Sequence, residues 1–296
     1  MTIHEAYLHI KNTLKEIYDE KEAANISELI LEKIFHLKKV DRILNKHQIV
    51  NTAQENILND YLQQLVNHKP VQYVLQEAWF AGMKFFVDEN VLIPRPETEE
   101  LVEWIVQDAG CKIQVASFEE PIHNSPLTVL DIGTGSGCIA IALKKKLHAE
   151  VYAIDVSEAA LKIASFNAKN NNADINFLQA DILQQPLNIQ LPLFDIIVSN
   201  PPYIAQKESV EMHANVVRYE PHIALFVPNE NPLLFYNAIS NFALHHLKQN
   251  GKLFFEIHEN SANEIIKLLQ QKSFSSTEIK KDLQQKNRMV KAVFFK

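Results

Sequence analysis

Residues 199–203 have the sequence Ser-Asn-Pro-Pro-Tyr, and these residue types suit recognition of a planar group that carries an NH₂. Proline has no backbone N–H and a fixed φ, so the carbonyls around Pro201 and Pro202 are stiffly held and free to accept hydrogen bonds. Asn200 adds a side-chain acceptor and an NH₂ donor, and Tyr203 adds a flat aromatic face. Taken alone, the same residues are equally typical of an ordinary turn.

The apolar run at residues 194–198 indicates where in the fold residues 199–203 lie. The run has the length and β-branched content of a buried strand, so residues 199–203 are expected to emerge at its carboxyl end. Open α/β sheets bind ligands at the carboxyl ends of their strands. The position therefore favours a ligand site over a simple turn.

A glycine loop lies upstream. Residues 128–132 predict a strand, residues 133–137 (Gly-Thr-Gly-Ser-Gly) a loop, and residues 138–147 a helix. Three of only six glycines in the chain fall in this loop, as expected where the backbone turns sharply beneath a ligand that faces a helix N-terminus. The spacing differs from the G-x-G-x-x-G dinucleotide motif, and the preceding Asp131 would repel a pyrophosphate. A cofactor without phosphates fits better.

Acidic residues end the next two predicted strands. Residues 150–155 end in Asp155, about 20 residues after the glycines, where a carboxylate can accept hydrogen bonds from ribose hydroxyls. Residues 175–180 are followed by Asp181 and Ile182, a pair able to bracket an adenine ring. A strand-end turn explains any one of these acids, but acids at successive strand tips beside one glycine loop indicate a shared adenosine ligand.

Length and composition bound the class of protein. A chain of 296 residues favours two domains, and a net charge of −7 argues against a large non-specific nucleic-acid footprint. Cys111 and Cys138 match no disulfide or metal spacing, and the chain shows neither a signal pattern nor an apolar run of the ~18 residues that span a bilayer. These features predict a reduced, cytoplasmic protein without a metal site.

The chain divides into three predicted parts: a helical bundle over residues 1–70, a hairpin linker over residues 71–95 and an α/β domain over residues 96–296. The bundle contains no glycine, and its helices are expected at residues 3–18, at 27–37, after Asp41, and from a capping box at 52–55 to Val66. Strands are expected within the linker at residues 79–80, 84–87 and 91–93. Arg95 is expected to be solvated. A helix is expected to begin near Pro96, where the third part starts, and residues 110–126 are expected to form a surface loop.

The glycine loop with Asp131 and Asp155 resembles the class I S-adenosylmethionine methyltransferases. The Asn-Pro-Pro-Tyr segment is similar to the motif of those members that methylate planar NH₂ groups of amides or bases. Further stretches resemble one family, the peptide chain release factor glutamine N5-methyltransferases, and they lie at residues 70–74, 85–103, 219–225 and 281–290. The resemblance covers the chain from about Pro70 to its end.

The resemblance implies a Rossmann-like methyltransferase domain, with a mostly parallel sheet and an antiparallel edge strand, preceded by a small all-helical domain that recognises the substrate. It implies an S-adenosylmethionine-dependent enzyme that methylates the side-chain nitrogen N5 of the glutamine in the Gly-Gly-Gln motif of release factors. The partner would be a release factor bound by a monomer, with no direct nucleic-acid binding and no membrane.

The predicted site residues fall into two groups. The predicted catalytic residues are Asn200, Pro201, Pro202 and Tyr203. The predicted cofactor-binding residues are Asp131, Gly133, Thr134, Gly135, Ser136, Gly137, Asp155, Asp181, Ile182 and Asn200. In this hypothesis Asn200 Oδ1 and the Pro201 carbonyl accept the two amide hydrogens of the substrate, and Tyr203 packs on the amide plane. Because position 200 is Asn rather than Asp, the site would act by positioning and polarisation rather than as a general base.

Two alternatives remain at the level of sequence. A nucleic-acid base N-methyltransferase would use similar acceptors but needs a basic channel or a pocket for a flipped base, which the acidic balance of the chain disfavours. A catalytically idle cofactor-binding interaction protein would have no need of an intact Asn-Pro-Pro-Tyr segment. Turnover with the cofactor discriminates between these classes.

Overall fold

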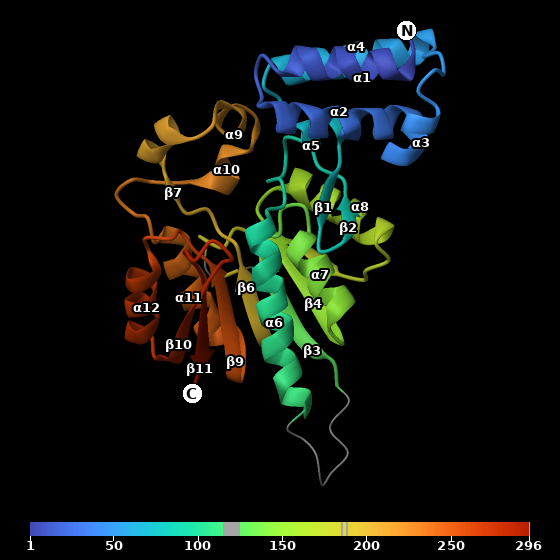
Figure 1. Ribbon diagram of the computed structural model, residues 1–296. Helices are drawn as coiled ribbons and strands as arrows, with labels where there is room; N and C mark the ends of the chain where they lie inside the picture. Colours follow the sequence, from blue (N-terminus) through green and yellow to red (C-terminus); the bar gives the residue numbers. More distant parts are fainter. Residues whose placement is uncertain (115–124, 185, 188, 296) are drawn as a thin grey trace. The chain divides into compact units, whose positions relative to one another are not determined.

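The computed structural model describes residues 1–114, 125–184, 186–187 and 189–295, and these form two compact units. The first unit contains Met1–Glu77 and His213–Tyr219, and the second contains Ala78–Met212 and Glu220–Lys296. Figure 1 colours the helices at the start of the first unit blue.

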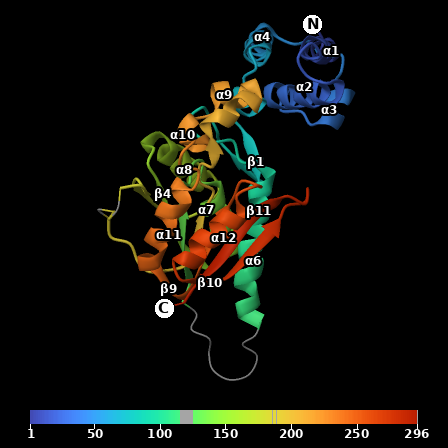
Figure 2. The same cartoon turned by 90° about the vertical axis from the view of Figure 1, so that its left-hand side faces the viewer.

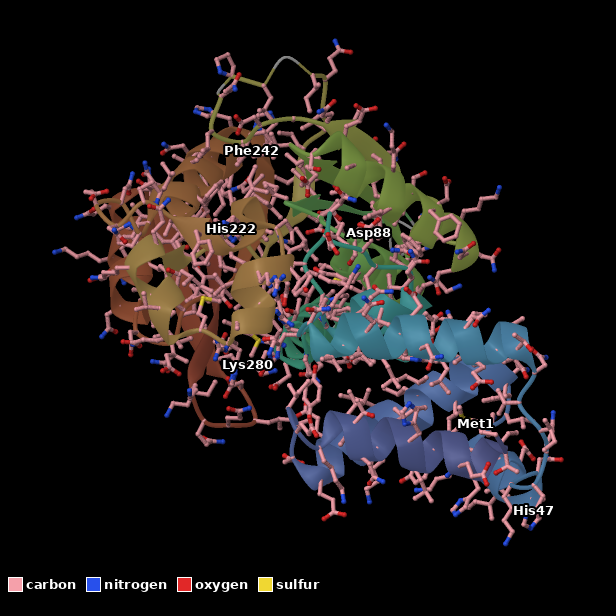
Figure 3. All side chains as sticks on the ribbon, turned by 90° about the horizontal axis from the view of Figure 1, so that it is seen from above. Met1, His47, Asp88, His222, Phe242 and Lys280 are labelled. Carbon is pink, nitrogen blue, oxygen red and sulfur yellow. The ribbon has the colours of Figure 1, made fainter. Side chains whose placement is uncertain are left out.

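Helices make up the first unit. They are α1 (Ile3–Leu14), α2 (Glu20–Phe35), α3 (Lys39–Leu44), α4 (Thr52–Val66), α5 (Val71–Leu75) and α9 (Ala214–Tyr219). The apolar residues Ile3, Ile10 and Leu14 of α1 recur at helical spacing and are fully buried in the core that α1 shares with α2 and α4. The first helix is tied to the segment after α3, because Val50 N–H donates to the Met1 carbonyl (2.9 Å). Met1 and His47 accordingly lie at the same end of the bundle (Figure 3).

The predicted helices exist, but several boundaries differ. Helix α1 ends at Leu14, and α2 begins earlier than predicted, at Glu20, because Asp19 caps its first N–H groups. The capping box of α4 lies one residue before the predicted one. Asn51 accepts from Gln54 N–H (2.9 Å) and Gln54 Oε1 accepts from Asn51 N–H (3.1 Å). Asn and Thr are both good cap residues, so the sequence pattern alone does not choose between neighbours.

The predicted linker is only partly a hairpin. Strands β1 (Ala78–Phe80) and β2 (Met83–Phe85) pair antiparallel as predicted, while residues 71–75 form α5 of the first unit. The strand predicted at residues 91–93 is wrong. Val91 and Ile93 are buried without forming a strand, so their apolar character reflects core packing rather than sheet pairing.

A seven-stranded sheet organises the second unit. Its strands are β3 (Leu127–Ile132), β4 (Ala149–Asp155), β5 (Asn176–Gln179), β6 (Phe194–Ser199), β9 (Leu247–Glu256), β10 (Phe274–Lys281) and β11 (Asn287–Phe294). Their order is β10-β11-β9-β6-β3-β4-β5. Strands β3 to β6 and β9 pair in parallel, while β11 is antiparallel to both of its neighbours. A smaller parallel pair joins β7 (Ile204–Ala205) to β8 (Phe226–Val227).

The predicted mostly parallel sheet with an antiparallel edge strand is confirmed, because the edge strand β10 pairs antiparallel with β11. The strand that runs against all the others is β11, second from the edge. The crossover through α12 (Ala262–Gln271) carries β10 to the outermost position. The hairpin from β10 then brings β11 back into the place between β10 and β9. Sequence periodicity gives the direction of neither strand, so this insertion was not visible in the chain.

Helices cover both faces of the sheet. Figure 2 shows α11 (Leu234–His246) on one side and α6 (Pro96–Gln114) on the other. Successive side chains of β9 point to opposite faces, as strand geometry requires. The ring of Phe254 packs edge-on against Trp104 of α6 (5.4 Å), and the ring of Phe255 packs edge-on against Tyr236 of α11 (5.1 Å). Phe242, which Figure 3 labels on α11, belongs to the same core.

The predicted surface loop at 110–126 is partly replaced by helix, because α6 continues to Gln114, and residues 115–124 of that prediction lie outside the described residues. Within the described ranges, no helix combines the length and apolar character that crossing a membrane requires.

Candidate active site

The glycine loop between β3 and α7 (Cys138–Lys146) depends on backbone conformations that favour glycine. Gly133, Gly135 and Gly137 have φ values of 72°, 54° and 82°. A Cβ at Gly137 would lie 3.1 Å from Cβ of Ala164 in α8 (Glu158–Asn170), so a side chain there would be both crowded and strained. A Cβ at Gly133 or Gly135 would meet nothing within 4 Å. The loop therefore packs closely beneath and presents bare backbone to open space above.

That open space is part of a cavity of about 240 Å³ at the carboxyl ends of β3, β4 and β6. Many of the predicted site residues line it: Gly133, Gly135, Asp155, Asp181, Ile182, Asn200, Pro201 and Pro202. Residues that sequence reasoning did not place there also contribute, and these include Asn90, Leu92, Pro221, Ile223, Ala224 and Phe235. Residues from distant parts of the chain thus converge on the place where a parallel sheet is expected to bind its ligand.

Asp155 lies at the end of β4 with both carboxylate oxygens engaged by backbone. Oδ2 accepts from Gly135 N–H (2.8 Å) and Oδ1 from Ser157 N–H (2.9 Å). Each oxygen keeps a further lone pair, which a ribose hydroxyl can use. Burial raises the pKa of Asp155 despite these hydrogen bonds.

Four predicted cofactor residues, Asp131, Thr134, Ser136 and Gly137, are not among the described residues that line the cavity. Asp131, Thr134 and Ser136 are buried, and Asp131 Oδ2 accepts from the Thr134 hydroxyl (2.6 Å) and from Ala140 N–H (3.2 Å). The Ser136 carbonyl accepts from Asn167 Nδ2 (2.9 Å), just before the tightly packed Gly137. These residues shape the loop on which the ligand would rest.

The second carboxylate oxygen of Asp131, the buried Oδ1, makes no hydrogen bond to the described residues. Burial, opposed by the hydrogen bonds from Thr134 and Ala140, raises the pKa of Asp131 to about 7. Asp131 is fully buried and does not line the cavity, so this oxygen is not exposed to a ligand bound there.

We expect Asp131 to make stability depend on pH in a defined direction. Its folded-state pKa of about 7 lies above the ordinary 3.8, so its contribution is fully present below about pH 4 and is lost as the pH rises through 7. The Asp131→Asn variant lacks this titration. Urea unfolding of the ligand-free proteins should therefore show the variant gaining stability relative to wild type between pH 5 and pH 8. A constant difference across that range would contradict the shift.

Asn200 follows β6 with its side chain held in one direction. Its Nδ2 donates to the Thr98 hydroxyl (3.3 Å), which leaves Oδ1 as the polar side-chain atom available to the cavity. Pro201 and Pro202 line the cavity beside it. The NH₂-recognising acceptors predicted from the sequence therefore border the same space as the glycine loop.

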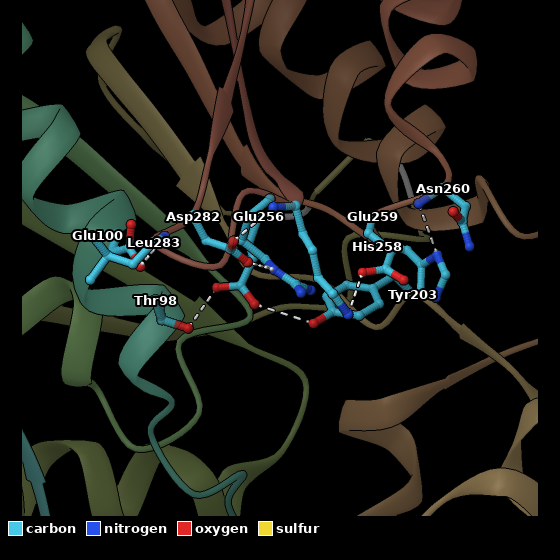
Figure 4. A network of polar contacts seen from close by, with 11 residues as sticks. Thr98, Glu100, Tyr203, Glu256, His258, Glu259, Asn260, Asp282 and Leu283 are labelled. Atoms are coloured by element: carbon cyan, nitrogen blue, oxygen red, sulfur yellow. Dashed lines mark hydrogen bonds and ion pairs between the residues drawn. The ribbon is translucent and has the colours of Figure 1, made fainter.

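Tyr203 is not among the described residues that line the cavity. Its hydroxyl donates to Glu256 Oε1 (3.2 Å), and its ring packs edge-on against His258 (6.2 Å) (Figure 4). Burial and the neighbouring charge of Glu256 raise the pKa of Tyr203, so its hydroxyl stays protonated at neutral pH. The same carboxylate accepts from the Thr98 hydroxyl at Oε2 (2.6 Å).

Arg95 is not the solvated arginine that the sequence suggested. Its guanidinium pairs with Glu220 Oε1 (2.6 Å), and the Glu220 side chain is only 1% exposed. Glu220 Oε2 also accepts from Ile93 N–H (3.4 Å). Arg95 therefore neutralises a buried carboxylate directly before Pro221, which lines the cavity.

Thr98 and Glu256 are two further polar residues near the site that sequence reasoning missed. Glu256 follows the apolar residues 253–255 at a strand end, which is the same signal that identified Asp131 and Asp155. Thr98 lies in the first turn of α6, where a hydroxyl is ordinary helix-entry chemistry. Only the folding of α6 against β9 brings the two together.

Comparisons with known proteins agree with this geometry. Residues 104–221 match the model of the methyltransferase small domain, and residues 5–75 match that of the PrmC N-terminal domain. A release factor glutamine methyltransferase from Flavobacterium psychrophilum is 46% identical and covers 95% of each chain. One from Bacteroides thetaiotaomicron is 38% identical over 96% of this chain and 97% of its own.

Among solved structures, a methyltransferase from Pyrococcus furiosus is similar with a TM-score of 0.51, over 80% of this chain and all of that one. At 17% identity this likeness concerns the fold alone. The match to the methyltransferase small domain, the relatives, the glycine loop and the acid at the end of β4 together define a class I methyltransferase. More particularly, the chain belongs to the release factor glutamine methyltransferase family.

S-adenosylmethionine is the cofactor of this class, and the residues present fit it. The space above Gly133 and Gly135 accepts a ligand, and Asp155 presents oxygens with free lone pairs.

Proposed function

We propose that this protein transfers a methyl group from S-adenosylmethionine to the side-chain nitrogen N5 of the glutamine in the Gly-Gly-Gln motif of peptide chain release factors. The observation that carries this proposal is the 46% identity to a release factor glutamine methyltransferase over 95% of both chains. The Asn-Pro-Pro segment beside the glycine loop supports it, because this segment offers acceptors for an amide NH₂.

The cofactor, when bound, supplies a methyl group made electrophilic by its sulfonium. The backbone at Gly133 and Gly135 would lie against it, and Asp155 would accept from its ribose hydroxyls. Asp181 and Ile182 line the same cavity and would bracket its adenine ring. Asp181 Oδ1 already accepts from Leu183 N–H (2.9 Å), so its carboxylate is oriented before any ligand binds.

The chain's own groups would position the substrate amide. An amide nitrogen is a weak nucleophile because its lone pair is delocalised into the carbonyl, so alignment is the main task of the site. In our proposal Asn200 Oδ1 and the Pro201 carbonyl accept the two N–H groups and stabilise charge that develops on nitrogen. Tyr203 would pack on the amide plane while Glu256 holds its hydroxyl. A neutral Asn at position 200 suits this role better than that of a base.

The direct test is mass spectrometry of a bacterial release factor incubated with the protein and S-adenosylmethionine. We expect one added methyl group, located on the glutamine of the Gly-Gly-Gln motif. An unmodified glutamine in the presence of bound cofactor would refute the proposal. Methylation of nucleic acid in a parallel reaction would favour the base N-methyltransferase instead.

We also propose that the helical residues 1–70 recognise the body of the release factor. Large apolar side chains of the first unit are exposed around α3, namely Val40 (67%), Leu44 (76%) and Ile49 (68%). Val40 and Leu44 lie on α3 and Ile49 lies on the segment after it, and exposed apolar groups close together in the chain are a candidate protein-binding surface. We further propose that the enzyme works as a monomer in the cytoplasm and does not bind nucleic acid directly, in line with its net charge of −7.

Replacing Val40, Leu44 and Ile49 together by serine should lower the rate on an intact release factor by roughly tenfold, the effect of losing about 1.4 kcal/mol of contact energy. The rate on a short Gly-Gly-Gln peptide should not change, because the cavity lies in the second unit. Leu283→Ser is the matched control, since Leu283 is 87% exposed but belongs to the second unit. Equal losses on both substrates would mean that the bundle only supports the fold.

A further inference from the structure

Glu256 is a buried carboxylate that contacts two elements of the site at once. It ends β9 and is 2% exposed. Oε2 accepts from the Thr98 hydroxyl (2.6 Å) and Oε1 accepts from the Tyr203 hydroxyl (3.2 Å), as Figure 4 shows. Thr98 in turn accepts from Asn200 Nδ2 (3.3 Å). A single carboxylate is thus connected to both ends of the Asn-Pro-Pro-Tyr segment.

The direction of these hydrogen bonds follows from counting protons. A hydroxyl has one proton to donate, and the 2.6 Å separation from Glu256 is typical of donation to an ionised carboxylate. Thr98 Oγ1 then offers only lone pairs to Asn200. The group that Asn200 turns toward Thr98 must therefore be its NH₂ and not its carbonyl oxygen.

The surroundings of Glu256 are consistent with a carboxylate that acts as an acceptor. Burial raises its pKa and the charge of Glu97 adds to that rise, while the hydrogen bonds from Thr98 and Tyr203 and the positive charge of Arg288 oppose it only in part. Arg288 itself is held by Asp282, whose Oδ2 accepts from Arg288 Nε (3.2 Å). A nearby cation and two donors favour the ionised form.

We propose that Thr98 and Glu256 are positioning residues that fix the orientation of the Asn200 amide, so that Oδ1 faces the NH₂ group of the substrate. This inference rests on the function proposed above. In the flipped orientation Asn200 would place its own NH₂ against that of the substrate, and neither group could accept. The hydrogen bonds that join Asn200 to Thr98 and Thr98 to Glu256 exclude the flip, because the Thr98 hydroxyl has no second proton to offer.

The same series of hydrogen bonds, from Asn200 through Thr98 to Glu256, explains why position 200 is Asn and not Asp. A carboxylate at position 200 would place two acceptors around the Thr98 hydroxyl, which can satisfy only one of them. One acceptor would then lie next to Thr98 lone pairs without a donor, at a cost of about 1–3 kcal/mol if it stays buried. The identity of residue 200 is therefore coupled to a carboxylate that follows 56 residues later in β9.

The first test is Thr98→Val, which keeps the shape of the side chain and removes the hydroxyl. The change removes the bond to Glu256 as well as the bond from Asn200 that orients the amide. We expect the loss of the bond from Asn200 to lower turnover of the release factor roughly 3- to 10-fold, while cofactor affinity measured by calorimetry is unchanged. Thr98→Ser should restore the rate. Thr277→Val, the same change on the edge strand β10, is the matched control and should behave as wild type.

Coupling to Asn200 separates positioning from general support of the fold. If Thr98 acts through Asn200, adding Thr98→Val to Asn200→Ala should cause no further loss of turnover. A loss in that background as large as in wild type would overturn the proposal. A wild-type rate in Thr98→Val alone would overturn it as well.

The sharpest test reverses the direction of the hydrogen bonds that link residues 256, 98 and 200. In the double variant Asn200→Asp with Glu256→Gln, the new amide at position 256 can donate to Thr98 Oγ1, which frees the Thr98 proton for the carboxylate at position 200. We expect this double variant to turn over faster than Asn200→Asp alone, with the net charge of the cluster restored. A rate equal to or lower than that of Asn200→Asp alone would count against the proposed series of hydrogen bonds. Failure of the wild-type protein to methylate the release factor would instead overturn the proposed function together with this inference.

Discussion

Replacing Asn200 by alanine should lower turnover on the release factor by ~10²-fold or more, the usual effect of removing one oriented hydrogen bond to a transition state. The fold should persist, because Asn200 lies at the cavity after the end of β6 and is not part of the buried core. Most of the cofactor affinity should persist too, since the glycine loop and Asp155 remain in place. Single-turnover rates and calorimetry together measure both quantities.

Asn200→Asp should retain measurable activity, exceeding that of Asn200→Ala and remaining below wild type. The new carboxylate keeps an acceptor for the substrate amide. It also adds negative charge near a sulfonium, which tightens binding of the ground-state cofactor without accelerating a step in which that charge is dispersed. Competition with Glu256 for the Thr98 proton lowers the rate further. A rate of Asn200→Asp equal to that of wild type would contradict this account.

The second large effect concerns Asp155. Asp155→Ala should weaken S-adenosylmethionine binding by roughly 1–3 kcal/mol, or about 5- to 150-fold in Kd, because buried polar groups of the ligand lose their partner. The loss includes an indirect part, since Asp155 Oδ2 also holds Gly135 N–H (2.8 Å) and thereby shapes the loop. Calorimetry with S-adenosylmethionine measures the change.

Asp174→Ala is the matched control for this effect. Asp174 is exposed on the segment before β5 and does not line the cavity. Its loss should leave the affinity for S-adenosylmethionine as in wild type. Undiminished affinity in Asp155→Ala would remove Asp155 from the cofactor site.

Much of the sheet could be predicted because its central strands are buried on both faces. Strands β3, β4 and β6 appear in the sequence as short continuous apolar runs, and the glycine loop marks the turn after β3. The same reasoning was wrong for residues 91–93, where Val91 and Ile93 fill the core although neither belongs to a strand. The position of β11 inside the sheet depends on a crossover and a hairpin, and local periodicity records neither.

The sequence could predict those residues of the site that lie at the end of a single predicted strand. Asp155, Asp181 and Asn200 lie at or just after the carboxyl ends of predicted strands, and all three line one cavity. Thr98 and Glu256 were missed because their role arises from a contact between residues 158 positions apart. Arg95 was misjudged for the same reason, since its partner Glu220 is distant in sequence and buried.

The most direct test of the central claim is a time course of glutamine methylation, followed by mass spectrometry of the release factor, for wild type, Asn200→Asp and Asn200→Ala. We predict one methyl group on the glutamine of the Gly-Gly-Gln motif, with rates that fall in that order and with the alanine variant ~10²-fold or more below wild type. If all three proteins methylate the glutamine at the same rate, the Asn-Pro-Pro-Tyr segment is only a turn and the central claim is wrong.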